Sequence, residues 1–230
     1  MLATTAYLAL SLTGAAFSSP LTSRSVVLRR STDSSQPAVV DASYDGQCFY
    51  PKPTSRFKLD SYLGRWYQVA GTLAPFTAGC KCIYADYSLN ENNGTVNVQN
   101  GCELEGQEIS IQGTATPLSP SAGYGHVGVL RVQFPGQPAP DCPGPNYIVQ
   151  EIGAESSGSG CDVNAVSDDA FAIVQAANFT TLFVLSRQQS PGKASIEASN
   201  SNVAWLERAK SMGSDLSNVA VTDQSQCQFT

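Results

Sequence analysis

Short apolar runs rich in Val, Ile, Tyr and Thr recur from Gly64 onward, and Gly, Asn and Pro separate them. Such runs, bounded by turn formers, are typical of antiparallel strands joined by hairpins. We expect eight strands, at residues 64–73, 81–91, 94–104, 107–116, 126–134, 146–152, 170–177 and 180–187.

Alternation within the runs predicts a sheet with one apolar and one polar face. Val96 and Val98 share one side of the third run, and Ile109 and Ile111 repeat the pattern in the fourth. Asn92-Asn93-Gly94 is a strong hairpin signal, because Asn and Gly tolerate a positive φ. Eight strands in simple order predict an all-β fold, an up-and-down barrel that can enclose one small ligand. A two-sheet sandwich fits the same pattern.

One helix is expected after the strands. In residues 198–213, Val203, Leu206 and Ala209 recur at helical spacing, and Gly213 is a natural stop. We expect this helix to pack on the outside of the barrel. A short extended segment at residues 219–221 follows it.

The N-terminal region differs from the rest. Residues 1–19 are an uncharged apolar run that ends in small residues, which predicts a signal peptide; because its usual basic start is missing, a membrane anchor is the alternative. Residues 20–46 have no period that would bury one face, so we expect a disordered extension or propeptide, with Arg29-Arg30 as a candidate processing site. No later segment approaches the length of a membrane span. The prediction is a secreted, extracellular protein without an integral membrane span.

Charge narrows the choice of partners. The chain has 13 Lys and Arg against 19 Asp and Glu, a formal net charge of -6. This is the wrong sign for a protein that neutralises phosphates or anionic lipid. We therefore expect no nucleic-acid partner, and the sequence does not identify a protein partner.

All seven cysteines lie after the apolar N-terminal run, and disulfides persist in the compartments that exported chains reach. No metal site is expected, because one residue rather than two separates Cys80 from Cys82 and His126 is the only histidine. Asn93 and Asn178 each begin an Asn-X-Thr triplet at a predicted turn. Both are candidate glycosylation sites.

Two motifs at opposite ends of the strand region are more specific. LDSYLGRWYQVAGT contains Gly64-Arg65-Trp66 as a Gly-x-Trp core, and TTLFVLSRQ contains Arg187. They resemble the first and last signatures of the lipocalin family, and the resemblance covers residues 47–230. Within the family, CIYADYSLNENNGTVNVQN, GTATPLSP and DLSNVAVTDQSQC are most similar to the apolipoprotein D and bacterial outer-membrane (Blc-like) branch. The usual Thr-Asp-Tyr motif is absent, and Asp168-Asp169-Ala170-Phe171 follows a Gly/Ser-rich insertion there.

The resemblance implies roles for several residues. Gly64, Trp66 and Arg187 would close one end of the barrel, with the guanidinium over the indole. It also implies a disulfide between Cys82 and Cys227. Because side chains two apart on a strand share a face, Cys80 needs its own partner, for which we favour Cys102. Cys48, Cys142 and Cys161 then remain, and Cys48 with Cys161 is the favoured pair.

No catalytic constellation is visible: the single histidine has no paired carboxylate at a recognisable spacing, and no nucleophile elbow is present. The resemblance implies a carrier that binds a lipid, sterol, retinoid-like molecule or pigment inside the barrel, needs no cofactor and is not an enzyme. If Trp66 points inward, alternation gives eight candidate lining residues: Val96, Val98, Ile109, Ile111, Leu130, Val132, Phe171 and Phe183.

Two other functions are compatible with this fold. One is an enzyme that isomerises or cyclises a hydrophobic substrate, for which Arg131, His126 or Glu151 would be the polar group to inspect. The other is an interaction protein whose barrel is filled. A haem carrier with His126 as ligand is a further variant.

Overall fold

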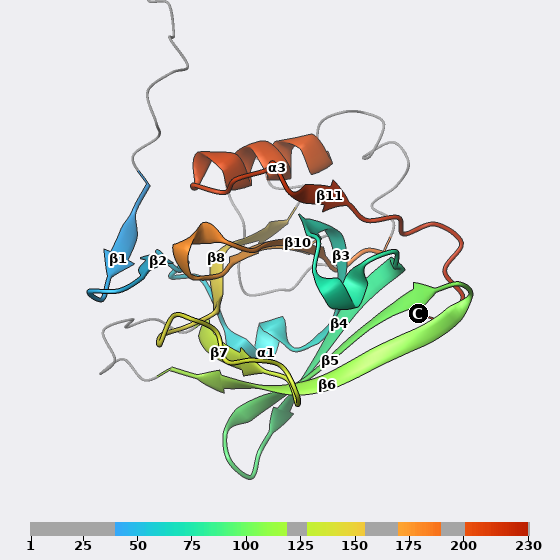
Figure 1. The fold of residues 1–230 in the computed structure, drawn as a ribbon, viewed down its shortest axis with the longest axis horizontal. Coiled ribbons are helices and arrows are strands. Elements are labelled where there is room, and N and C mark those ends of the chain that lie inside the picture. Colours follow the sequence, from blue (N-terminus) through green and yellow to red (C-terminus); the bar gives the residue numbers. More distant parts are fainter. Residues whose placement is uncertain (1–39, 119–127, 155–169, 190–200, 230) are drawn as a thin grey trace, which may run out of the picture. The chain divides into compact units, whose positions relative to one another are not determined.

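The computed structural model describes residues 40–118, 128–154, 170–189 and 201–229 (Figure 1). Within these ranges, no helix is both long and apolar enough to cross a membrane. The elements are, in order, β1 (Ala42–Tyr44), β2 (Phe49–Pro51), α1 (Leu59–Tyr62), β3 (Gly64–Thr72), η1 (Pro75–Thr77), β4 (Lys81–Asn90), β5 (Thr95–Leu104), β6 (Gln107–Pro117), β7 (Val129–Gln133), β8 (Tyr147–Ala154), β9 (Ala170–Gln175), η3 (Ala177–Phe179), β10 (Leu182–Ser186), α3 (Ser201–Ser211) and β11 (Val219–Val221).

The strands β3 to β10 form a closed antiparallel barrel. Each pairs with the next strand in the chain, and β10 returns to pair with β3, where Phe183 lies opposite Gly71 and Ser186 opposite Tyr67. The predicted up-and-down barrel is therefore confirmed, and the two-sheet sandwich is excluded. Each of the eight strands lies where the apolar runs placed it, within a few residues at either end.

Residues with a positive φ make the tight hairpins. Gly94 closes the turn between β4 and β5 with a φ of +71°, as the Asn-Asn-Gly signal predicted. Glu105 and Gly106, both with positive φ, make the turn between β5 and β6. Two successive residues of this kind give a turn whose twist matches the strands on either side.

Alternation along the strands decides which side chains fill the barrel. Trp66 lies opposite Ala85, which lies opposite Asn100, so these positions share the inner face. The buried interior cluster consists of Phe57, Tyr62, Trp66, Ala85, Tyr87, Val96, Val98, Ala115, Leu130, Tyr147, Val149, Ala170, Ala172, Val174 and Leu185.

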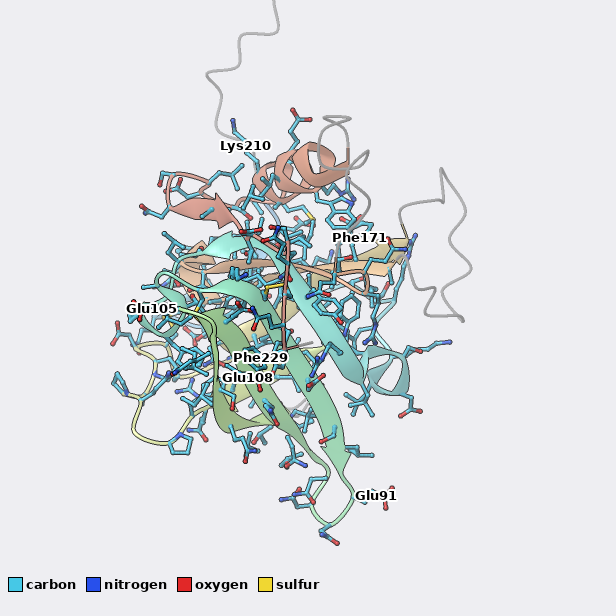
Figure 2. The ribbon with its side chains drawn as sticks, turned by 90° about the vertical axis from the view of Figure 1, so that its right-hand side faces the viewer. Glu91, Glu105, Glu108, Phe171, Lys210 and Phe229 are labelled. Carbon is cyan, nitrogen blue, oxygen red and sulfur yellow. A yellow bond between two sulfur atoms is a disulfide. The ribbon has the colours of Figure 1, made fainter. Side chains whose placement is uncertain are left out.

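The helix α3 packs against the outside of the barrel, as predicted (Figure 1). Its buried residues, Trp205 and Ala209, contact the outward-facing side chains of β3, β9 and β10. The ring of Phe171, which lies on β9 and is labelled in Figure 2, stacks on that of Trp205 with 4.6 Å between ring centroids. This second apolar cluster consists of Val69, Ala70, Ile173, Leu182, Val184, Trp205 and Ala209.

The C-terminal segment completes the barrel wall. β3 pairs with β4 only over residues 64–67, and further along β3 the strand β11 lies beside it, with Val221 opposite Ala70. The side-chain amide of Gln224 then donates hydrogen bonds to the carbonyls of Gln68 on β3, at 2.9 Å, and Ile83 on β4, at 2.8 Å. One buried side chain thus joins two strands where their own ladder is interrupted.

An N-terminal hairpin precedes the barrel, in a part of the chain for which the sequence predicted a disordered extension through residue 46. Ala42–Tyr44 instead forms β1, which pairs with β2. The backbone N–H of Phe49 donates to Oδ1 of Asn178, near the turn between β9 and β10. A boundary at residue 47 therefore falls inside this hairpin.

Three disulfides join described cysteines. Cys82 is bonded to Cys227 and Cys80 to Cys102, as predicted. The expected pair of Cys48 and Cys161 is wrong, because Cys48 is bonded to Cys142. The hairpin of β1 and β2 brings Cys48 to the segment between β7 and β8, a contact that sequence spacing does not reveal. Cys161 lies outside the described residues.

Candidate functional site

One end of the barrel is built around Trp66, which is fully buried at the start of β3. The Arg187 guanidinium lies over its ring, 4.0 Å from the centroid, as the two signatures implied. Arg187 also donates hydrogen bonds to the backbone carbonyls of Ser61, Leu63 and Arg65 at 2.6–2.9 Å. The guanidinium therefore fixes the turn that connects α1 to β3.

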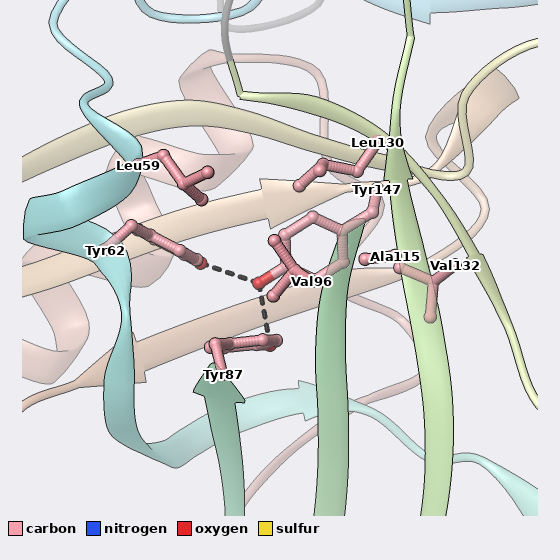
Figure 3. A pocket seen from close by; sticks show the side chains of 8 residues that line it. All are labelled: Leu59, Tyr62, Tyr87, Val96, Ala115, Leu130, Val132 and Tyr147. Atoms are coloured by element: carbon pink, nitrogen blue, oxygen red, sulfur yellow. Dashed lines mark hydrogen bonds between the residues drawn. The ribbon is translucent and has the colours of Figure 1, made fainter. Parts of the chain in front are cut away.

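A small pocket lies inside the barrel next to α1 (Figure 3). Side chains from α1 and from five neighbouring strands of the sheet, β4 to β8, line it. Apart from three tyrosine hydroxyl groups, the lining is apolar. The lining residues are Leu59, Tyr62, Tyr87, Val96, Ala115, Leu130, Val132 and Tyr147.

Three of these residues form the tyrosine cluster, defined as Tyr62, Tyr87 and Tyr147. The Tyr147 hydroxyl oxygen lies 2.6 Å from that of Tyr62 and 2.9 Å from that of Tyr87 (Figure 3). Tyr62 extends from α1, Tyr87 from β4 and Tyr147 from β8. Three separate parts of the chain thus place hydroxyl groups at one point of an otherwise apolar interior.

Burial governs the acidity of the cluster. It raises the pKa of Tyr87 to about 12, and it raises the pKa values of Tyr62 and Tyr147 well above the usual range. All three hydroxyl groups therefore keep their protons at neutral pH, because burial disfavours the charged form. The cluster supplies hydrogen-bond donors and acceptors without a net charge.

The predicted lining residues are only partly brought together. Val96, Leu130 and Val132 line the pocket. Val98 is buried in the interior cluster, and Phe183 is partly buried against it, but neither lines the pocket.

Two further lining candidates lie on β6. Cross-strand pairing puts Ile109 and Ile111 on the same face as Ala115, since they lie opposite Cys102 and Asn100. Both are half-exposed, so they sit away from the pocket. That Ile109 and Ile111 contact a ligand stays a prediction.

The orientation predicted for Phe171 is wrong. On β9, Ala170, Ala172 and Val174 fill the barrel, so Phe171 points outward and stacks on α3. The sequence run AFAIVQ is apolar on both faces, because this strand is covered by the interior on one side and by α3 on the other. Alternation therefore gave no signal for choosing the inner face.

Sequence reasoning missed the tyrosine cluster. A signal for Tyr87 was present: it lies two residues after Ala85, which faces Trp66 across the sheet, so it shares the inner face. Tyr62 and Tyr147 carry no such signal, because the position of a short helix and the offset of β8 depend on tertiary packing.

Arg131 and Glu151, two of the polar residues considered for an enzyme, do not line this pocket. Arg131 donates to the carbonyls of Cys142 and Gly144, and Glu151 pairs with Arg208 of α3 at 2.6 Å. His126 lies outside the described residues. Among the residues that the structure describes, no three His, Cys, Asp or Glu side chains gather as a metal site would require.

The two glycosylation candidates differ in their surroundings. Asn93 is exposed in the turn before β5, and its Oδ1 accepts hydrogen bonds from the backbone N–H and the hydroxyl of Thr95. Asn178 is part of the contact with the N-terminal hairpin: Oδ1 accepts from Phe49, and Nδ2 lies 3.4 Å from the Cys142 sulfur.

Comparison with known proteins agrees with this architecture. Residues 57–224 match the family model of the lipocalin-like domain. Apolipoprotein D of Bos taurus is 35% identical over 72 residues, which cover 31% of this chain and 38% of that protein. Outer membrane lipoprotein Blc of Vibrio cholerae is 25% identical over 174 residues, which cover 75% of this chain and 86% of that protein. Both belong to the branch that the sequence motifs indicated.

Similarity to apolipoprotein D thus spans well under half of that protein's length. Among solved structures, insecticyanin of the tobacco hornworm Manduca sexta has a TM-score of 0.50 and 19% sequence identity, over 81% of this chain and 92% of that one. At this identity the match concerns the fold.

Proposed function

This chain belongs to the lipocalin family, and on that premise we propose that it binds a small hydrophobic molecule inside its barrel. The observation that carries the proposal is the pocket beside α1, whose lining is apolar except for the tyrosine hydroxyl groups. Burial of apolar ligand surface against such a lining would drive binding at about 25 cal/mol per Å², less the cost of association.

The pocket holds only one end of such a ligand. The rest would extend along the inner face of the barrel, past Val98 and the partly buried side chains Val132, Phe134 and Phe183. Partly buried side chains can change rotamer more easily than fully packed ones, because fewer neighbours confine them. We expect the barrel to widen along this line when it is occupied.

We also propose that the protein is exported. The three disulfides agree with an oxidising compartment. Residues 1–19 would be the signal peptide, residues 20–46 the extension cleaved at or near Arg29-Arg30, and residues 47–230 the mature lipocalin domain, together with the preceding residues of the hairpin. The small size of the pocket favours a second candidate, an interaction protein whose barrel is filled.

The first test is native mass spectrometry of the full chain, secreted from a eukaryotic host, followed by solvent extraction. Displacement of a fluorescent polyene fatty acid by fatty acids, sterols and retinoids would measure binding. Ala115→Trp fills the pocket and should abolish binding of the fluorescent probe. Thr116→Trp, at an exposed neighbouring position, should leave binding of the probe unchanged. A wild-type protein that carries nothing and takes up none of these ligands would overturn carriage and favour the filled barrel.

A further inference from the structure

The tyrosine cluster has more hydroxyl protons than hydrogen bonds between its members. Each hydroxyl carries one proton, and each contact between two hydroxyl groups uses one. The three tyrosines share two contacts, and the described residues supply no other hydrogen-bond partner to these hydroxyl groups. At least one of the three protons therefore has no acceptor within the cluster, whichever way the hydrogen bonds run.

The spare donor is at the pocket. Tyr62, Tyr87 and Tyr147 are each less than one-tenth exposed, so bulk water does not satisfy the proton. The other residues that line the pocket are aliphatic and offer no side-chain acceptor. Buried donors normally have a partner, and an exception calls for an explanation. A ligand oxygen in this pocket would provide the missing acceptor.

The surroundings discriminate between kinds of oxygen. A carboxylate would bring a charge into a lining that has no cationic side chain. Arg187 is the nearby cation, but its guanidinium lies over the Trp66 ring, and its Nη groups already donate to three backbone carbonyls. An unpaired buried charge is far more costly than a neutral oxygen that accepts one hydrogen bond. A carbonyl group fits the site better than a carboxylate.

We propose that the tyrosine cluster receives the carbonyl oxygen of a neutral hydrophobic ligand, such as a ketone, aldehyde, ester or amide. This inference rests on the proposed function, since it assumes that the barrel binds a ligand. It adds an orientation to that function: the carbonyl enters first and lies next to α1, and the hydrocarbon portion extends along the barrel.

Three probes of equal chain length test the proposal: a long-chain 2-alkanone, the corresponding n-alkane and the corresponding fatty acid. Competition against the fluorescent polyene probe gives a Kd for each. One hydrogen bond to a buried donor should make the ketone bind about tenfold more tightly than the alkane. The fatty acid anion should bind more weakly than the ketone.

Infrared spectroscopy reports on the hydrogen bond directly. The carbonyl stretch of a ¹³C-labelled 2-alkanone should move to lower wavenumber on binding, relative to its position in an alkane solvent. The triple variant Tyr62→Phe/Tyr87→Phe/Tyr147→Phe keeps the rings and removes all hydroxyl groups, so it should lose both the shift and the tenfold preference. Tyr84→Phe removes an outer hydroxyl that binds Glu108, and it should keep both.

The outcomes separate the two proposals. If wild-type protein binds none of the three probes and none of the ligands of the first test, the carrier function fails. If it binds ligands of the first test but not the ketone, only the carbonyl site is refuted. If it binds ketone and alkane equally, with no infrared shift, carriage stands and the carbonyl site is refuted. Tighter binding of the fatty acid than of the ketone would show an anion site and also overturn the inference, and circular dichroism of the triple variant checks that it folds.

Discussion

Replacing Arg187 tests how much one side chain contributes to the closed end of the barrel. In Arg187→Ala, the carbonyls of Ser61, Leu63 and Arg65 lose their donor, and Trp66 loses the cation over its ring. Hydrogen bonds to a charged group contribute about 1.5–3 kcal/mol each, and a shielded cation–π contact contributes about 0.5–2 kcal/mol.

Water can replace part of the loss, because Arg187 is only half-buried. We therefore expect a net destabilisation of about 3–5 kcal/mol, less than the sum of the separate contacts. For a domain of this size, that corresponds to a fall in Tm of between about 6 and 20 °C. Arg187→Lys keeps the charge but not the planar fork that reaches several carbonyls, so it should lose about half as much stability.

Urea unfolding monitored by tryptophan fluorescence measures these free energies. Arg56→Ala is the matched control, since it removes the same charge from an exposed side chain. The slope of the unfolding transition should not change, because the surface exposed on unfolding is the same. A loss in Arg187→Ala within about 1 kcal/mol of the control would refute the reasoning, because it would leave no net value for the four contacts.

Three further predictions concern other parts of the molecule. A hydrogen bond from the backbone of the C-terminal segment lowers the pKa of Glu103, so the free energy of unfolding should fall as the pH drops below the usual glutamate range near about 4.3. In Glu103→Gln, the free energy of unfolding measured by urea titration at several pH values should depend less on pH. The same pH dependence as in the wild type would contradict this prediction. Mass spectrometry of secreted protein should find a glycan on Asn93 and none on Asn178, whose side-chain nitrogen packs against a disulfide; Asn93→Gln should then remove the full glycan mass. Phe171→Ala should cost about 2–4 kcal/mol by loosening α3 yet leave the affinity for interior ligands unchanged, and weaker ligand binding in a folded variant would count against its outward orientation.

Most of the barrel could be predicted because its strands combine β-forming residues with clear turns. The alternation of Val96 and Val98 with polar neighbours sufficed to assign the inner face of β5, and the Asn-Asn-Gly turn set its pairing with β4. The Gly-x-Trp motif and Arg187 then indicated that the first and last strands of the barrel meet. These signals are local, or they are carried by residues with one dominant role.

The candidate site could not be predicted in full from the sequence because its residues are brought together by contacts between distant parts of the chain. Tyr62 lies on the short helix α1, and Tyr147 begins β8 directly after a segment that the Cys48–Cys142 disulfide joins to the N-terminal hairpin. The positions of both side chains therefore depend on contacts between distant parts of the chain. The apolar run around Phe171 packs against the barrel interior on one side and against α3 on the other. Its hydrophobic pattern therefore does not indicate which side chains point inward. The predicted partner of Cys48 was wrong because the N-terminal hairpin, which brings Cys48 to Cys142, was not expected to be ordered.

The bridge that Gln224 makes between β3 and β4 also sets an order of events during synthesis. The third strand of the chain emerges from the ribosome early, but its partners in β10, in β11 and at Gln224 emerge more than a hundred residues later. Until then the edge of β3 has no neighbour along much of its length, and an unpaired edge can add a strand from another chain. Closing so long a loop is also slow. The nascent protein is therefore most exposed to mispairing just before its last segment appears, which makes this the stage at which a chaperone would contribute most.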